Sequence, residues 1–144
     1  MEIVSFEIAK KLKEKGFKEK CLTYYDVEDN VGLLFNMQYY SDYTCPCQYT
    51  DLLHSHNTDA TVAQPDDSEY CVDAPTIPQV LKWLRKEKNI FVVTFIADDS
   101  DIPLTYEIYM GTECLLTHHG EYFTLQEWDK CNLGGIEYVI DNLI

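Results

Sequence analysis

Basic residues are missing from most of this 144-residue chain. None occurs in residues 21–81 or in residues 89–129, and the formal net charge at pH 7 is −14. A protein that binds the phosphate backbone of DNA or RNA needs Lys and Arg to displace counterions. The charge therefore argues against direct nucleic-acid binding, and we expect no nucleic-acid partner.

Long apolar runs are also missing, because no stretch approaches the ~20 uncharged apolar residues of a membrane span. The first residues carry acids at Glu2 and Glu7, whereas a secretory signal begins with basic residues and continues with an apolar run. We therefore expect a cytoplasmic protein with no membrane partner. In that compartment the six cysteines are expected to remain reduced.

Familiar catalytic motifs are absent as well. The chain has no glycine-rich phosphate loop, dinucleotide-binding fingerprint or metalloprotease motif. A small hydrolase can be assembled only from scattered residues, with Cys114 or Cys131 as nucleophile and His118 or His119 as base. A carboxylate site is the other form of this alternative, and its acids would be those that cluster in one expected turn, Asp98, Asp99 and Asp101. No local signature of a cysteine hydrolase surrounds either cysteine, so we assign no catalytic residue and favour a non-enzymatic protein.

What the chain does contain is typical of a globular domain, with 46% hydrophobic and 25% charged residues. Its length fits one domain, so we expect residues 1–144 to form a single domain. The expected fold is α+β, a two-layer arrangement in which a mostly antiparallel sheet of four to five strands carries three helices on one face. The elements are expected in the order helix 5–16, strands 21–25 and 31–40, helix 76–89, strands 90–97, 104–110 and 114–117, and a helix from 124 onward.

The sequence makes specific predictions for two of these elements. Residues 90–97 are apolar on both faces, which predicts a central strand of the sheet. Thr124 and Glu127 have the spacing of a capping box at the start of the last helix. Gly134 and Gly135 are expected to break or bend that helix.

Residues 41–73 differ from the rest of the chain, with seven acids, no base and no sustained periodicity. They predict a long acidic loop or insertion. Thiolate and imidazole are ligands that zinc prefers, and four of them lie in this segment: Cys45, Cys47, His54 and His56. The one-residue separations are unusual for zinc, so a zinc-organised domain is an alternative and not the leading hypothesis.

Tyrosine is abundant, with 11 residues, and several crowd the first expected hairpin. Tyrosine suits half-buried strands and also interaction surfaces. A sheet face left uncovered by helices would place there the candidate contact residues Tyr24, Tyr25, Tyr39, Tyr40 and Tyr43. An acidic surface that mimics a nucleic-acid backbone is a further alternative.

Three segments, residues 5–17, 74–90 and 135–144, resemble a group of small uncharacterised proteins encoded in Bacteroidales genomes and their phages or prophages. The resemblance covers the helices and the start of the strand at Ile90, and it carries no catalytic residue. It implies a phage or mobile-element accessory protein. We therefore expect a non-enzymatic accessory protein that binds an unidentified protein partner.

Overall fold

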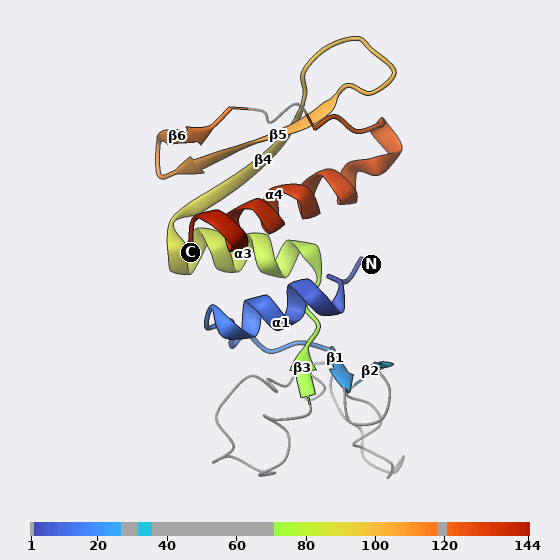
Figure 1. Cartoon of the computed structure of the whole chain (residues 1–144), viewed down its shortest axis with the longest axis vertical. Helices are drawn as coiled ribbons and strands as arrows, with labels where there is room; N and C mark the ends of the chain where they lie inside the picture. The colour runs from blue at the N-terminus through green and yellow to red at the C-terminus, as the bar shows by residue number, and fades with distance from the viewer. Residues whose placement is uncertain (1, 27–31, 36–70, 118–120) are drawn as a thin grey trace, which may run out of the picture. The chain divides into compact units, whose positions relative to one another are not determined.

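The structure, a computed structural model, describes residues 2–26, 32–35, 71–117 and 121–144 (Figure 1). The chain divides into two compact units, residues 3–76 and residues 77–144, and each is described by itself. The described residues form three α-helices and two antiparallel sheets of three strands. The predicted α+β class with antiparallel strands is confirmed.

The first unit begins with α1, Phe6–Glu14. The Ser5 hydroxyl accepts a hydrogen bond from the backbone N–H of Ile8 at 3.4 Å, as an N-cap does. Gly16 follows the helix with a φ of +88°, a left-handed conformation that glycine adopts most easily. The predicted start and end of this helix are confirmed.

The sheet of the first unit has β1, Thr23–Asp26, at its centre. It pairs antiparallel with β2, Gly32–Phe35, and on its other side with β3, Cys71–Asp73. The predicted first hairpin is therefore present. Residues 71–73, predicted as the end of a loop, form a strand instead, because three residues are too few to show a periodicity in the sequence.

The second unit is a helix, a three-stranded meander and a closing helix. Strands that follow one another in the sequence are neighbours in its sheet. Asn89, at a φ of +56°, turns the chain from the first helix into the first strand. The predicted capping box of Thr124 and Glu127 is present. The elements are α3, Ile77–Lys88; β4, Ile90–Ile96; β5, Leu104–Met110; β6, Glu113–Leu116; the 3-10 turn η3, Leu125–Glu127; and α4, Trp128–Asn142.

The strands form two separate sheets of three, where the sequence predicts one sheet of four to five. β3 completes the first sheet, and β4 pairs with β5 alone among the described strands. β4 is therefore an edge strand and not the predicted central strand. An apolar run on both faces also fits an edge strand whose outer face is left open, as Val93 shows with 42% of its surface exposed.

The glycine pair in α4 does not break the helix, which runs without interruption from Trp128 to Asn142. Gly135 is buried against the sheet, where a Cβ atom would lie 3.3 Å from the ring of Tyr106. The two glycines therefore serve close packing between helix and strand, and the expected break is wrong for that reason.

None of the described helices combines the length and the apolar character that crossing a bilayer requires.

Candidate interaction surface

Helix α4 covers one face of the sheet in the second unit (Figure 1). Gly135 approaches both Val92 on β4 and Tyr106 on β5. The Thr94 hydroxyl donates a hydrogen bond to Oδ1 of the buried Asn132 at 2.8 Å. The even-numbered residues of β4 therefore point toward α4.

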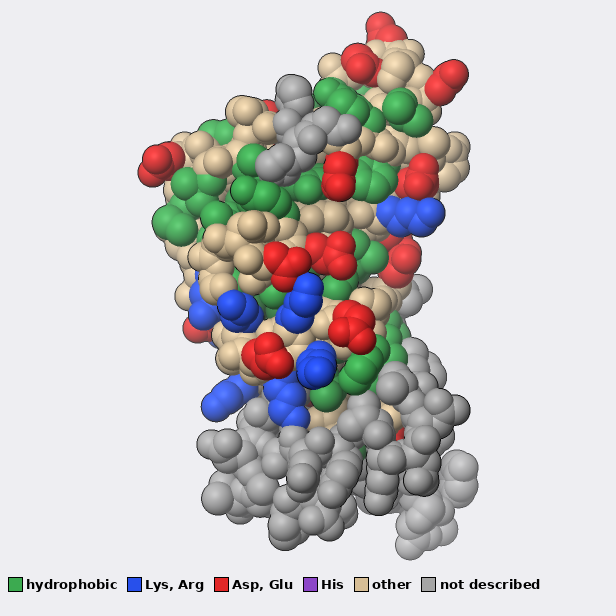
Figure 2. All heavy atoms as spheres, in the orientation of Figure 1, with side chains coloured by type: hydrophobic (Ala, Val, Ile, Leu, Met, Phe, Trp, Pro, Cys, Tyr) green, Lys and Arg blue, Asp and Glu red, His purple; other side chains and the backbone are tan. Residues whose placement is uncertain are grey.

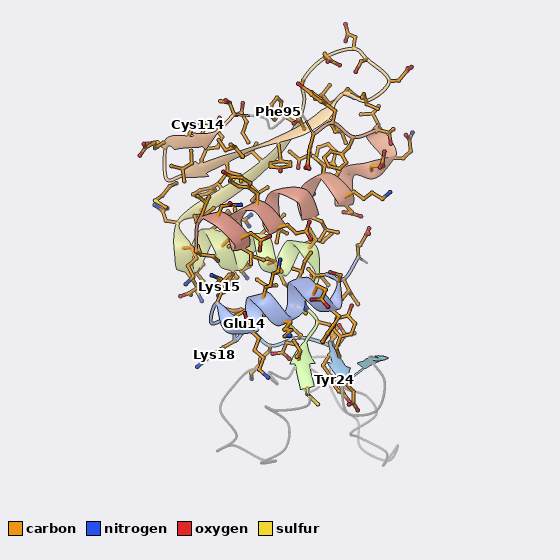
Figure 3. The ribbon with its side chains drawn as sticks, in the orientation of Figure 1. Glu14, Lys15, Lys18, Tyr24, Phe95 and Cys114 are labelled. Atoms are coloured by element: carbon orange, nitrogen blue, oxygen red, sulfur yellow. The ribbon has the colours of Figure 1, made fainter. Side chains whose placement is uncertain are left out.

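Side chains alternate along a strand, so the odd-numbered residues of β4 point to the other face. The register places Phe91 opposite Tyr109, Val93 opposite Glu107, and Phe95 opposite Thr105. On the next strand, Cys114 lies opposite Tyr109. Figure 3 shows Phe95 and Cys114 on the side of the sheet away from α4. We call this surface the open face; its residues are Phe91, Val93, Phe95, Glu107, Tyr109 and Cys114.

The open face ends at Thr105. This side chain is fully buried, and its hydroxyl donates to the backbone carbonyl of Glu121 at 3.0 Å. Val93 and Cys114 are exposed, and the three aromatic rings are half-buried. The accessible part of the face therefore extends from β4 across Tyr109 to β6.

One hydrogen bond organises the polar groups of the open face. The Tyr109 hydroxyl donates to Oε2 of Glu107, two residues earlier on β5. This hydrogen bond, with burial and the negative charge of Glu107 as smaller causes, raises the pKa of Tyr109 to about 12. At neutral pH the face thus presents a neutral phenol beside a carboxylate, and both are acceptors for a cationic donor.

Exposed apolar side chains concentrate in the second unit. Every large hydrophobic residue that is exposed in the described part of the chain lies in residues 77–144, and the set is Val93, Ile96, Ile102, Met110, Leu115, Tyr122, Leu125 and Trp128. Of this set, Val93 lies on the open face, and single exposed apolar residues at the other positions are normal.

The segment that forms the strands of the second unit is acidic. Residues 89–129 contain eight acids and no Lys or Arg. Figure 2 shows green apolar and red acidic side chains over the strands of the second unit. An apolar face on an acidic segment favours a partner that carries apolar and basic side chains together.

The tyrosines predicted as contacts occupy different positions. Tyr24 is 4% exposed and belongs to the core of the first unit (Figure 3). Tyr25 is half-buried; its hydroxyl donates to the Val4 carbonyl at 2.8 Å, and its ring packs edge-on against Phe6. Tyr24 is therefore a core residue, and the ring of Tyr25 packs within the first unit. Tyr39, Tyr40 and Tyr43 lie outside the described residues.

The predicted zinc ligands Cys45, Cys47, His54 and His56 also lie outside the described residues. Within residues 2–26, 71–117 and 121–144, no group of three or more His, Cys, Asp or Glu side chains is placed to hold a metal ion. The zinc-organised domain therefore stays a prediction.

The hypothetical hydrolase residues are not brought together by the described part of the chain. Cys114 is exposed on β6, and Cys131 is buried under the sheet beside Thr94. Burial raises the pKa of the Cys131 thiol, which keeps it protonated and unreactive at neutral pH. His118 and His119 lie outside the described residues.

A polar cluster in the first unit was missed by sequence reasoning. The Lys13 ammonium donates a hydrogen bond to the Cys71 carbonyl at 3.1 Å. Asp73, two residues after Cys71 on β3, is fully buried. Burial lowers the pKa of Lys13, and the negative charge of Asp73 opposes that shift. The periodicity of α1 placed Lys13 near its basic end, but it could not show that β3 would supply an acceptor.

The buried thiol of Cys21 lies close enough to Asp73 to be affected by its charge. Burial, with the charges of Asp73 and Glu19 as smaller causes, raises the pKa of this thiol well above its usual range. Cys21 is therefore a core residue and no nucleophile. The cluster ties α1 to β3, and we assign it a structural role.

Comparisons of this chain with protein-family models, with curated proteins and with solved structures gave no match.

Proposed function

We propose that this chain is a non-enzymatic protein-binding module. Its open face binds a segment of a partner protein in which apolar side chains are flanked by Lys or Arg. The observation that carries the proposal is that the open face joins three half-buried aromatic rings and the exposed Val93 to the carboxylate of Glu107, within residues 89–129, which contain acids and no Lys or Arg. A role as an accessory protein of a phage or mobile element rests on the sequence resemblance alone, and a cytoplasmic location stays a prediction.

The chemistry of the open face supports binding more than catalysis. Its aromatic rings offer large, rigid contact area, and tyrosine is enriched at the energetic centres of interfaces. Tyr109 lies on the middle strand, and its hydrogen bond to Glu107 fixes a carboxylate in the middle of the face. A cationic side chain of the partner would meet this carboxylate in partly apolar surroundings, where charge pairing is stronger than in water.

The test compares wild type with Tyr109→Lys and Cys114→Lys, which add a cation to the centre and to the β6 side of the open face. The matched control is Glu137→Gln, which makes the same change in net charge at an exposed position of α4. Proteins captured by each variant from a cell lysate are identified, and the best candidate is purified and titrated calorimetrically.

We expect one partner to bind wild type and Glu137→Gln equally, and to bind each open-face variant at least ~10-fold more weakly. Binding to wild type should also weaken as salt is added, because the pairing is between opposite charges. A purified partner that binds all four proteins with the same affinity would show that the open face is not the site. The absence of any partner that wild type retains and Tyr109→Lys loses would overturn the proposed function.

A further inference from the structure

Along the outer edge of β4, no described segment pairs with the backbone. In an antiparallel ladder, residues alternate between those that exchange hydrogen bonds with one neighbour and those whose N–H and C=O point the other way. Gly111 N–H donates to the Asn89 carbonyl at 3.0 Å, and Ala97 N–H donates to the Pro103 carbonyl at 2.8 Å. The odd-numbered residues of β4 therefore bond to β5.

The N–H and C=O groups of the even-numbered residues point away from β5, and these residues are Ile90, Val92, Thr94 and Ile96. No backbone hydrogen bond joins any of them to another segment in the part of the chain that the structure describes. Figure 1 shows β4 at the edge of its sheet with β5 on one side.

This edge lacks the features that normally prevent strand pairing. Natural edge strands are often short, interrupted by proline or a bulge, or marked by a charged side chain. Strand β4 has seven residues, no proline, no charged residue and an unbroken register with β5. Such an edge can accept another strand, and main-chain hydrogen bonds then supply the affinity.

The two ends of β4 carry opposite charge. The last turn of α3 places Arg85, Lys86 and Lys88 just before the strand. The turn after the strand carries Asp98, Asp99 and Asp101, all of them exposed. An added strand therefore meets a basic group at one end and an acidic group at the other.

We propose that β4 pairs antiparallel with β4 of a second copy of this chain, which joins two three-stranded sheets into one of six. With the even-numbered residues forming the new hydrogen-bonded pairs, full overlap sets Ile90 opposite Ile96 and Val92 opposite Thr94 of the other copy. Val93 then faces its own equivalent across the two-fold axis. This register is the one that uses all the outward-pointing groups of both strands.

Charge complementarity identifies the occupant as a second copy. Antiparallel pairing brings the basic end of each β4 beside the acidic turn of the other copy, so the same favourable contact is made twice. The strand itself carries no charge that would oppose pairing, although the whole chain has a net charge of −14. A seven-residue strand is a small interface, so association should be reversible and dependent on concentration.

The experiment is sedimentation equilibrium of the full chain in reducing buffer, with two charge-reversal variants. One variant combines Lys86→Glu with Lys88→Glu, and the other combines Asp99→Lys with Asp101→Lys. Each variant alone places like charges at both contacts of its own dimer. A mixture of the two restores opposite charges at both contacts, so the mixture also shows that both variants are folded.

We expect wild type to dimerise, each variant alone to dimerise at least ~10-fold more weakly, and the equimolar mixture to regain dimerisation as a heterodimer. A wild type that stays monomeric at the highest soluble concentration would overturn the proposal. Wild-type dimers that survive in both variants would also overturn it, because the dimer would then use another surface.

The dimer does not depend on the proposed function, and separate variants test the dimer and the partner site. Cys114→Lys alters the β6 side of the sheet and should leave the dimer intact. The charge-reversal variants leave the open face intact and should keep a partner bound there.

Discussion

The backbone of Gly135 on α4 lies directly against the side chain of Val92 on β4, so that a Cβ atom at position 135 would clash with Cγ1 of Val92. Real Cβ atoms do not approach so closely, so the Val92 side chain, the helix or the strand would have to move. This contact sets how near α4 lies to the sheet whose opposite side is the open face.

Gly135→Ala should therefore lower the free energy of unfolding by about 1–3 kcal/mol, as other overpacked cores do. The sign of this change in the free energy of unfolding is informative, because Gly→Ala at an unhindered helix position stabilises a protein by up to ~1 kcal/mol. Urea unfolding followed by circular dichroism measures the change. Adding Val92→Ala should recover part of the loss, and a double variant no more stable than Gly135→Ala would mean that Val92 is not the obstacle.

The Lys13 contact predicts a second stability effect. Lys13→Met keeps most of the aliphatic stem but removes the donor to the Cys71 carbonyl and the cation beside the buried Asp73. Losing a hydrogen bond from a charged group at a partly buried site should cost about 1–3 kcal/mol. Lys10→Met, at an exposed position of the same helix, should change stability by less than ~0.5 kcal/mol. Equal effects of the two substitutions would show that the contact contributes nothing.

Tyr106 predicts a loss of stability at alkaline pH. Its ring is buried under α4, and burial, with the charge of Glu121 and a hydrogen bond to it at 3.4 Å, raises its pKa to about 12. A tyrosine in the unfolded chain has a pKa of about 10. Because the pKa of Tyr106 is higher in the folded protein, its contribution to the free energy of unfolding is complete below pH ~10. This contribution is lost as the pH rises toward ~12.

The free energy of unfolding should therefore fall more steeply with pH above ~10 in wild type than in Tyr106→Phe, which has no phenol to ionise at this position. Tyr109 has a raised pKa as well and stays in both proteins, so it affects both curves alike. Parallel curves for the two proteins would contradict the assigned role of Tyr106.

The described cysteines should differ in reactivity. Cys114 is exposed, whereas Cys21, Cys71 and Cys131 are buried, and burial raises the pKa of Cys21 and Cys131. In the native protein, iodoacetamide should modify Cys114 much faster than the three buried thiols, as followed by peptide mass spectrometry. In urea the four rates should converge. A native rate for Cys131 as high as that for Cys114 would revive the hydrolase hypothesis.

The sequence was sufficient for elements with strong local signals. The cap at Ser5, the exit at Gly16 and the capping box at Thr124 are local chemistry, and each is present. The antiparallel hairpin from β4 to β5 followed from its alternation and its short connection. These features depend on neighbours in the chain, so periodicity and capping rules are enough to predict them.

Features that depend on distant partners could not be predicted in the same way. An apolar strand looks the same whether it is central or at an edge, so nothing in residues 90–97 showed that one side of β4 would have no described neighbour. A glycine pair looks the same whether it bends a helix or lets it approach a strand, and only the position of Val92 decides. The candidate surface changed for this reason from the tyrosines near β1 to the open face of the second unit.

The central claim is that α4 covers one face of the second unit's sheet and that no described element covers the other. Methyl-resolved NMR with a soluble paramagnetic gadolinium chelate tests it most directly in dilute wild-type protein. The methyl groups of Val93, which is 42% exposed on the open face, should be strongly broadened, and those of the fully buried Ile108 under α4 should be unaffected. Val93 methyl groups as well protected as those of Ile108 would contradict the account.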